Sequence, residues 1–111
     1  MINKLKNEEE KIEKITSKII NELKEPLKQL NDMQKMRAQI IENDVNQIIS
    51  NNNKDINLID KVFDKLVDIL YYDYTLIEQS YLNLVNYCKN VDEDIAEFYY
   101  QEYLKIANEG G

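Results

Sequence analysis

Apolar residues recur every three or four positions along most of the chain, and polar residues fill the positions between them. This spacing is that of an amphipathic helix and differs from the strict alternation of a strand. It predicts three long helices, which run over about 8–50, 56–89 and 92–108. We therefore expect an all-α protein, with a single domain over 1–111 folded as a small antiparallel helical bundle.

The first predicted helix contains Pro26, the only proline in the chain. A proline inside a helix lacks the backbone donor and pushes against the carbonyl four residues earlier, here that of Glu22. Leu23 and Leu27 nevertheless stay in phase across it, and Glu25 is a poor N-cap. We therefore favour one continuous helix kinked near 26. A break at this point, which would give four helices in effect, stays open. The apolar stripe of this helix comprises Ile12, Ile15, Ile19, Leu23, Leu27, Leu30, Met33, Ile40, Ile41, Val45 and Ile48.

Two polar segments separate the helices, "SNNNKD" at 50–55 and "KNVDED" at 89–94. Asn and Asp favour turns and helix N-caps, so we expect Asn53 or Asp55 to cap the second helix and Asn90 or Asp92 the third. The apolar stripe of the second helix comprises Ile59, Val62, Phe63, Leu66, Leu70, Tyr74, Ile77, Tyr81, Leu84, Val85 and Cys88. The stripe of the third comprises Ile95, Phe98, Tyr99, Tyr103 and Ile106.

The predicted helices differ in length. At 1.5 Å per residue the first would be roughly 64 Å long, the second roughly 50 Å, and the third under about 30 Å. Helices of such unequal length cannot cover one another's apolar stripes completely. Part of the stripe of the first helix should therefore remain exposed and bind a partner. We expect a homo-oligomer in which a second copy completes the bundle as a coiled coil, and we favour a dimer because dimers are the commonest closed assembly.

Charge is divided unevenly along the chain. The net charge of −7 splits into +1 for residues 1–54 and −8 for residues 55–111. An acidic surface repels phosphates, so we expect no direct binding of nucleic acid. A basic protein partner is possible, and an acidic mimic of nucleic acid is a second alternative. No apolar run is long enough to span a membrane, and the single Cys88 suits a reducing compartment, so we expect a cytoplasmic protein without membrane contact.

The residue types that are missing exclude several kinds of active site. The chain has no histidine, one cysteine and two glycines, both at the C-terminus. This excludes histidine zinc sites, Ser-His-Asp triads, thiolate pairs and glycine-rich phosphate loops. We therefore predict no catalytic residue, metal or cofactor, and no enzyme activity. A carboxylate-only metal-binding bundle or enzyme stays an alternative, which would need three or more of Glu78, Glu97, Glu102 and Asp73 to converge inside the bundle.

The aspartates of the second helix recur at i, i+4 and i+8, at positions 60, 64 and 68. Lys61 and Lys65 lie close enough to offset their repulsion. We therefore interpret these aspartates as a solvated face that neutralises itself, with a site for a cation or a basic partner as the alternative.

The tyrosines suggest where a partner would bind. Tyr71, Tyr72 and Tyr100 lie off the apolar stripes, and Asp68 and Asp73 lie near the first two. Tyrosine is enriched at protein interfaces because it joins a large apolar ring to a hydroxyl. We predict that these five residues contribute to partner binding. The chain is thus expected to be a non-enzymatic helical interaction or assembly module, which self-associates through apolar and tyrosine-rich helix faces.

Overall fold

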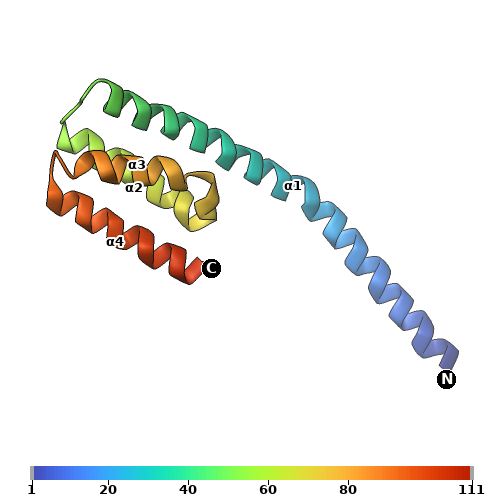
Figure 1. Cartoon of the computed structure of the whole chain (residues 1–111). Coiled ribbons are helices and arrows are strands. Elements are labelled where there is room, and N and C mark those ends of the chain that lie inside the picture. The colour runs from blue at the N-terminus through green and yellow to red at the C-terminus, as the bar shows by residue number, and fades with distance from the viewer. Residues whose placement is uncertain (1, 111) are drawn as a thin grey trace. The chain divides into compact units, whose positions relative to one another are not determined.

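In a computed structural model, which describes residues 2–110 and the side chains of residues 8–109, the chain is almost entirely helical (Figure 1). No strand occurs among these residues, which confirms the predicted all-α class. The elements are α1 (Ile2–Ser50), α2 (Ile56–Asp73), the short 3-10 helix η1 (Tyr74–Leu76), α3 (Glu78–Cys88) and α4 (Glu93–Gly110). The contacts divide the chain into two compact units, Met1–Met33 and Gln34–Gly111. The single domain expected from the sequence stays a prediction.

The described residues of the N-terminal unit, 2–33, all belong to helix α1. Helix α1 contains Pro26 within its bounds and continues past it, which confirms a continuous helix over a break, while the kink near 26 stays a prediction. Pro26 has no N–H to donate to the Glu22 carbonyl oxygen. Where the backbone is exposed, water can donate this hydrogen bond instead. Every side chain from residue 8 to residue 30 is exposed. This unit therefore has no core of its own among its described residues.

The C-terminal unit, residues 34–111, holds the core. All buried side chains of the described residues lie between Ala38 and Ile106. The end of α1 contributes Ile41, Val45 and Ile48, and these residues share one hydrophobic cluster with residues of α2, α3 and α4. The largest fully buried side chains are Tyr81, Phe63, Ile59, Leu66, Ile69, Leu70, Leu84, Val45 and Cys88. The second half of α1 is thus stabilised by packing, whereas the first half depends on helix propensity and on whatever covers it.

The second predicted helix, 56–89, is wrong as a single element because the chain leaves the helical path at Asp73. The backbone of Asp73 is extended, with φ −162° and ψ 101°, and its Oδ1 accepts hydrogen bonds from Thr75 N at 3.1 Å and Thr75 Oγ1 at 2.6 Å. A short polar side chain offers the backbone a local alternative to the helix, which explains the interruption. The 3-10 turn η1 follows, and α3 begins at Glu78. The bundle therefore contains four α-helices where the sequence predicted three.

Two of the expected N-caps are confirmed. The Asp55 carboxylate accepts from Asn57 N at 3.0 Å and Leu58 N at 3.3 Å at the start of α2. The Asp92 carboxylate accepts from Asp94 N at 3.1 Å and Ile95 N at 3.2 Å at the start of α4. Each cap satisfies donors that would otherwise lack a partner in the first turn, so the sequence located both helix starts correctly.

Candidate functional site

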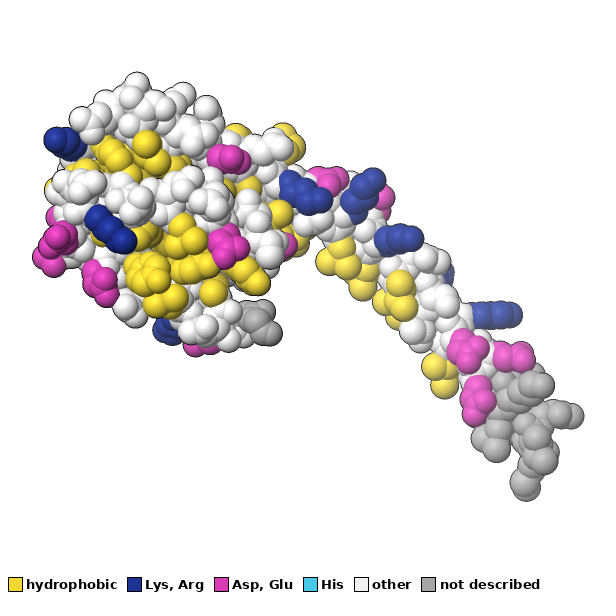
Figure 2. Space-filling view, viewed as in Figure 1, with side chains coloured by type: hydrophobic (Ala, Val, Ile, Leu, Met, Phe, Trp, Pro, Cys, Tyr) yellow, Lys and Arg dark blue, Asp and Glu magenta, His cyan; other side chains and the backbone are white. Residues whose placement is uncertain are grey.

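An exposed apolar surface runs along the N-terminal unit. Its members, which we call the N-terminal stripe, are between 44% and 63% exposed. They are Ile12, Ile15, Ile19, Leu23, Leu27, Leu30 and Met33. Hydrophobic side chains follow one side of this helix in the space-filling view (Figure 2). Contiguous apolar surface on this scale is characteristic of a contact face and unusual for a free surface.

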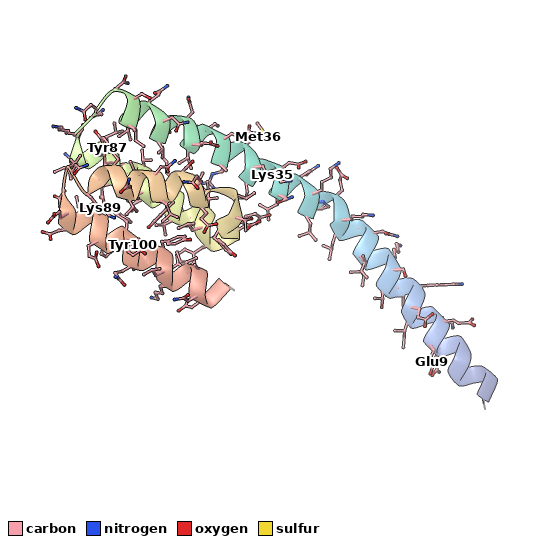
Figure 3. The ribbon with its side chains drawn as sticks, in the orientation of Figure 1. Glu9, Lys35, Met36, Tyr87, Lys89 and Tyr100 are labelled. Carbon is pink, nitrogen blue, oxygen red and sulfur yellow. The ribbon has the colours of Figure 1, made fainter. Side chains whose placement is uncertain are left out.

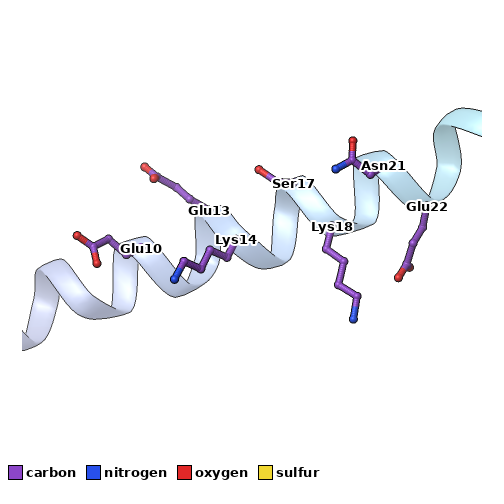
Figure 4. Close-up of a pocket in the computed structure, with 7 residues that line it drawn as sticks. All are labelled: Glu10, Glu13, Lys14, Ser17, Lys18, Asn21 and Glu22. Carbon is purple, nitrogen blue, oxygen red and sulfur yellow. The ribbon is translucent and has the colours of Figure 1, made fainter.

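The opposite side of the same helix is polar. A shallow hollow there is lined by Glu10, Glu13, Lys14, Ser17, Lys18, Asn21 and Glu22, which all belong to α1 (Figure 4). A single helix cannot enclose a ligand, because no second element supplies the other wall of a pocket. Residues Glu10 and Lys14 have the favourable i, i+4 order of opposite charges. The hollow is therefore a solvated helix face, and the candidate site lies on the apolar side.

The predicted tyrosine surface is assembled only in part. Tyr71 and Tyr72, which are 60% and 40% exposed, line a shallow depression together with Asp73. Ile106 and Glu109 of α4 line the same depression. The Asp73 carboxylate is already engaged by Thr75. This depression thus combines two exposed aromatic rings with acidic side chains.

The other two predicted partner-binding residues lie elsewhere. Tyr100, which is labelled with Lys89 in Figure 3, is 39% exposed. It lines a different depression, together with Lys89 and Glu97. Asp68 is exposed and lines neither depression. The structure therefore does not bring the five residues together into one site.

Phe98 corrects the predicted stripe of the last helix. Its side chain is 59% exposed, whereas the neighbouring Tyr99 is buried. Consecutive helical residues point about 100° apart, so only one of the two can face the core. Tyr99 takes that place because its ring stacks on Phe63, with centroids 4.1 Å apart and planes 11° apart. The ring of Phe98 instead lies nearly perpendicular to that of Tyr99, with centroids 5.0 Å apart, so a residue predicted to face the core is exposed.

Several carboxylates accept hydrogen bonds from tyrosines. Tyr99 Oη donates to Asp60 Oδ1 at 2.5 Å and lies 3.3 Å from Asp64 Oδ1. Tyr103 Oη donates to Glu78 Oε1 across α3 and α4. The aspartate face of α2 is therefore more than a solvated surface, because two of its members bind the hydroxyl of a core tyrosine. The interpretation of Asp60 and Asp64 as self-neutralised by lysines missed this link.

These environments keep the tyrosines protonated. Burial raises the pKa of Tyr99 well above its ordinary value, and the hydrogen bonds and charges of Asp60 and Asp64 raise it further. The hydrogen bond to Glu78, followed by burial, raises the pKa of Tyr103 to about 12. Burial and then the charge of Glu102 raise the pKa of Tyr81, whose hydroxyl donates to the Tyr99 carbonyl oxygen at 2.6 Å. A hydroxyl held in this way acts as a structural donor and is unsuited to act as a base at neutral pH.

The remaining predicted chemistry was a cluster of carboxylates. Glu97 is exposed and accepts a hydrogen bond from Gln101 Nε2 at 2.9 Å, while Glu78 is engaged by Tyr103. Among the described residues, no group of three or more histidines, cysteines, aspartates or glutamates is placed to hold a metal ion.

Of the helices in the described part of the chain, none is both long enough and apolar enough to cross a membrane. Comparison with protein-family models, with curated proteins and with solved structures finds no match for this chain.

Proposed function

We propose that the chain is a non-enzymatic helical assembly module that self-associates by burying the N-terminal stripe. The observation that carries the proposal is the exposure of this stripe, from 44% at Leu30 to 63% at Ile12, on a unit whose described residues form no core. Half-burial of each such side chain stabilises an assembly by about 1 kcal/mol. Seven of them on each copy provide enough apolar surface to offset the free-energy cost of association, which is about 4–15 kcal/mol.

The test is a pair of double variants with the same spacing on opposite sides of α1. Ile19→Gln with Leu23→Gln removes two stripe residues, and Ser17→Gln with Asn21→Gln changes two residues of the polar face. Light scattering after size exclusion, over a range of concentrations, measures assembly, and circular dichroism measures helix content. We expect the first variant to raise the dissociation constant by more than about 30-fold and the second to leave it unchanged. A wild-type chain that stays a 13.2 kDa monomer at every concentration contradicts the proposal.

A second contact surface is proposed on the C-terminal unit. The depression at Tyr71 and Tyr72 is flanked by Asp73 and Glu109, and residues 34–111 carry seven basic and fourteen acidic side chains. A basic protein segment with an apolar anchor fits this combination. We place the module in the cytosol, where its single, buried Cys88 stays reduced.

The measurement for this second surface is binding of a basic, leucine-containing peptide. Tyr71→Ala should weaken binding by about tenfold or more if the ring is an anchor, whereas Phe98→Ala, which removes an exposed ring on α4 that does not line this depression, should not. Equal effects of both substitutions, or none, would remove this surface from the proposal.

A further inference from the structure

We infer that the occupant of the N-terminal stripe is the same stripe of a second copy, lying antiparallel to the first about a two-fold axis level with Asn21. This inference rests on the proposed function, since it specifies the partner and its direction. It uses only the helix formed by residues 8–33 and the charges of the chain.

The residues of the N-terminal stripe are spaced symmetrically along the chain about Asn21. Ile12 and Leu30 are equally far from Asn21, as are Ile15 and Leu27, and Ile19 and Leu23. Steps of three and four residues keep these side chains on one side of the helix. A reversed copy centred on this level therefore opposes six of the seven stripe residues with apolar residues, while Met33 lies level with Glu9 of the second copy.

Along one flank of the stripe, the side-chain charge changes from positive to negative at the level of Asn21. Lys11 and Lys18 precede Asn21 on this flank, and Glu22 and Glu25 follow it, all at helical steps of three, four or seven residues. In an antiparallel pair related by a two-fold axis, each flank lies beside the same flank of the other copy, running in the opposite direction. Lys18 then lies beside Glu25 of the second copy, and the symmetry forms this pair twice. The charge pattern thus complements a second copy of the chain itself.

The polar residues near the stripe tolerate this arrangement. Thr16 Oγ1 donates to the Ile12 carbonyl oxygen at 2.8 Å, so burial of this side chain leaves no unmet donor. Thr16 and Pro26 are equally far from Asn21, so each Pro26 lies opposite a threonine. A parallel pair in register would instead place the two prolines, and the two carbonyls of Glu22 that lack a helical donor, at the same level.

Net charge selects the antiparallel direction. Residues 1–33 carry seven basic and seven acidic side chains, so the whole net charge of −7 belongs to residues 34–111. A parallel pair places two such acidic units at the same end of the paired helices, whereas an antiparallel pair places them at opposite ends. Repulsion falls off over a Debye length of about 8 Å at physiological salt, so separating the units in this way removes most of it.

Disulfide trapping tests the direction. Ile12→Cys and Leu30→Cys are prepared as separate proteins, oxidised alone and as an equimolar mixture, and analysed on non-reducing gels with mass spectrometry. The wild type, whose Cys88 is buried, gives the background. We expect a covalent dimer between positions 12 and 30 in the mixture and no dimer above background in either protein alone, because equivalent positions of antiparallel copies would lie about 27 Å apart.

Each other outcome overturns the inference. Efficient dimers of each protein alone would show a parallel pair, which contradicts the direction and leaves the proposed function standing. Dimers in light scattering without any covalent product would show assembly through another surface. Monomers in light scattering would overturn the inference and the proposed function together.

Exchange of charge provides an independent readout. Lys18→Glu alone and Glu25→Lys alone should each weaken self-association by about fivefold, because each places like charges together twice. An equimolar mixture of the two variants should associate as strongly as the wild type, since every pair across the mixed dimer then joins opposite charges. Circular dichroism checks that both variants keep the helix content of the wild type. A mixture no stronger than the single variants contradicts the antiparallel register.

Discussion

The hydroxyl of Tyr99 joins the aromatic core to the acidic face of α2. Its ring stacks on Phe63, while its hydroxyl donates to Asp60 at 2.5 Å. The backbone carbonyl of the same residue accepts from the Tyr81 hydroxyl at 2.6 Å. One residue of α4 thus fixes its position against both α2 and α3. Helical periodicity predicts that Tyr99 faces the core, but it does not predict which carboxylate receives the hydroxyl.

Tyr99→Phe tests this role because it keeps the ring and removes the hydroxyl. We expect the free energy of unfolding to fall by about 1–2 kcal/mol, since a hydrogen bond to a carboxylate is lost. Urea denaturation measures the change. Tyr100→Phe is the matched control, because Tyr100 is the exposed neighbour and its substitution should have almost no effect on stability. Equal losses for the two variants would contradict a specific contribution from the Tyr99 hydroxyl.

Stability should also depend on alkaline pH. Folding raises the pKa of Tyr103 from 10.0 to about 12, and the pKa values of Tyr81 and Tyr99 rise as well. The fold thus favours the protonated phenols, so their contribution is complete below pH 10 and is lost as pH rises toward and through 12. Urea denaturation at several values between about pH 9 and pH 12 should show this decline. Tyr103→Phe should make the decline shallower, and a flat profile above pH 10 would contradict the assignment.

At the scale of the helices, Pro26 and Asp73 show what a sequence pattern can predict. Leu23 and Leu27 keep the apolar phase across Pro26, and the helix is continuous there. Leu70, Tyr74, Ile77 and Tyr81 keep the same spacing, yet the chain leaves the helix at Asp73. Apolar periodicity records which residues face the core, and a short 3-10 turn can preserve that facing. The signal for the interruption was local, in the Asp-x-Thr pattern whose carboxylate binds Thr75.

The caps and the surface followed from simpler physical rules. The sequence predicts Asn53 or Asp55, and Asn90 or Asp92, as N-caps, because few other side chains accept from the first-turn amides; Asp55 and Asp92 take these positions. The exposed first stripe followed from the unequal helix lengths, whereas the exposure of Phe98 did not. The choice between Phe98 and Tyr99 depends on a long-range stack with Phe63, about which the local sequence is silent.

Pro26→Ala should strengthen the N-terminal helix. The substitution restores a backbone donor to the Glu22 carbonyl and removes the clash of the ring, an effect of up to about 3 kcal/mol in a helix interior. Hydrogen exchange should show slower exchange for the amides of residues 23–30, with a higher helix content by circular dichroism. Gln29→Ala, which changes only helix propensity at an exposed position, is the control. Faster exchange in Pro26→Ala would indicate that the proline fixes a bend on which the N-terminal unit depends.

For the molecule as a whole, the core and the N-terminal stripe lie in different parts of the chain. Every buried side chain among the described residues belongs to the C-terminal unit, from Ala38 to Ile106. The N-terminal unit carries the stripe and no net charge, while the C-terminal unit carries the charge of −7. The helical class, the caps and the exposed stripe could be predicted from the sequence. The division into two units could not be predicted from the sequence. It depends on which part of α1 packs against the other helices, and the apolar stripe of α1 continues through both parts.

This division leads to a prediction about a shortened chain of residues 34–111. Removal of residues 1–33 deletes no buried side chain of the described structure, so the remaining chain should unfold cooperatively. Its free energy of unfolding should lie within about 1 kcal/mol of that of the full chain, measured at a concentration where the full chain is monomeric. It should also stay monomeric in light scattering at concentrations where the full chain associates, because it lacks the N-terminal stripe and carries the whole net charge of −7. A shortened chain that still associates would place the self-association contact on the C-terminal unit, where Met36, Ile40 and Phe98 are also exposed. A shortened chain that fails to fold would contradict the prediction, because it would show that the core needs residues 1–33 although none of their described side chains is buried.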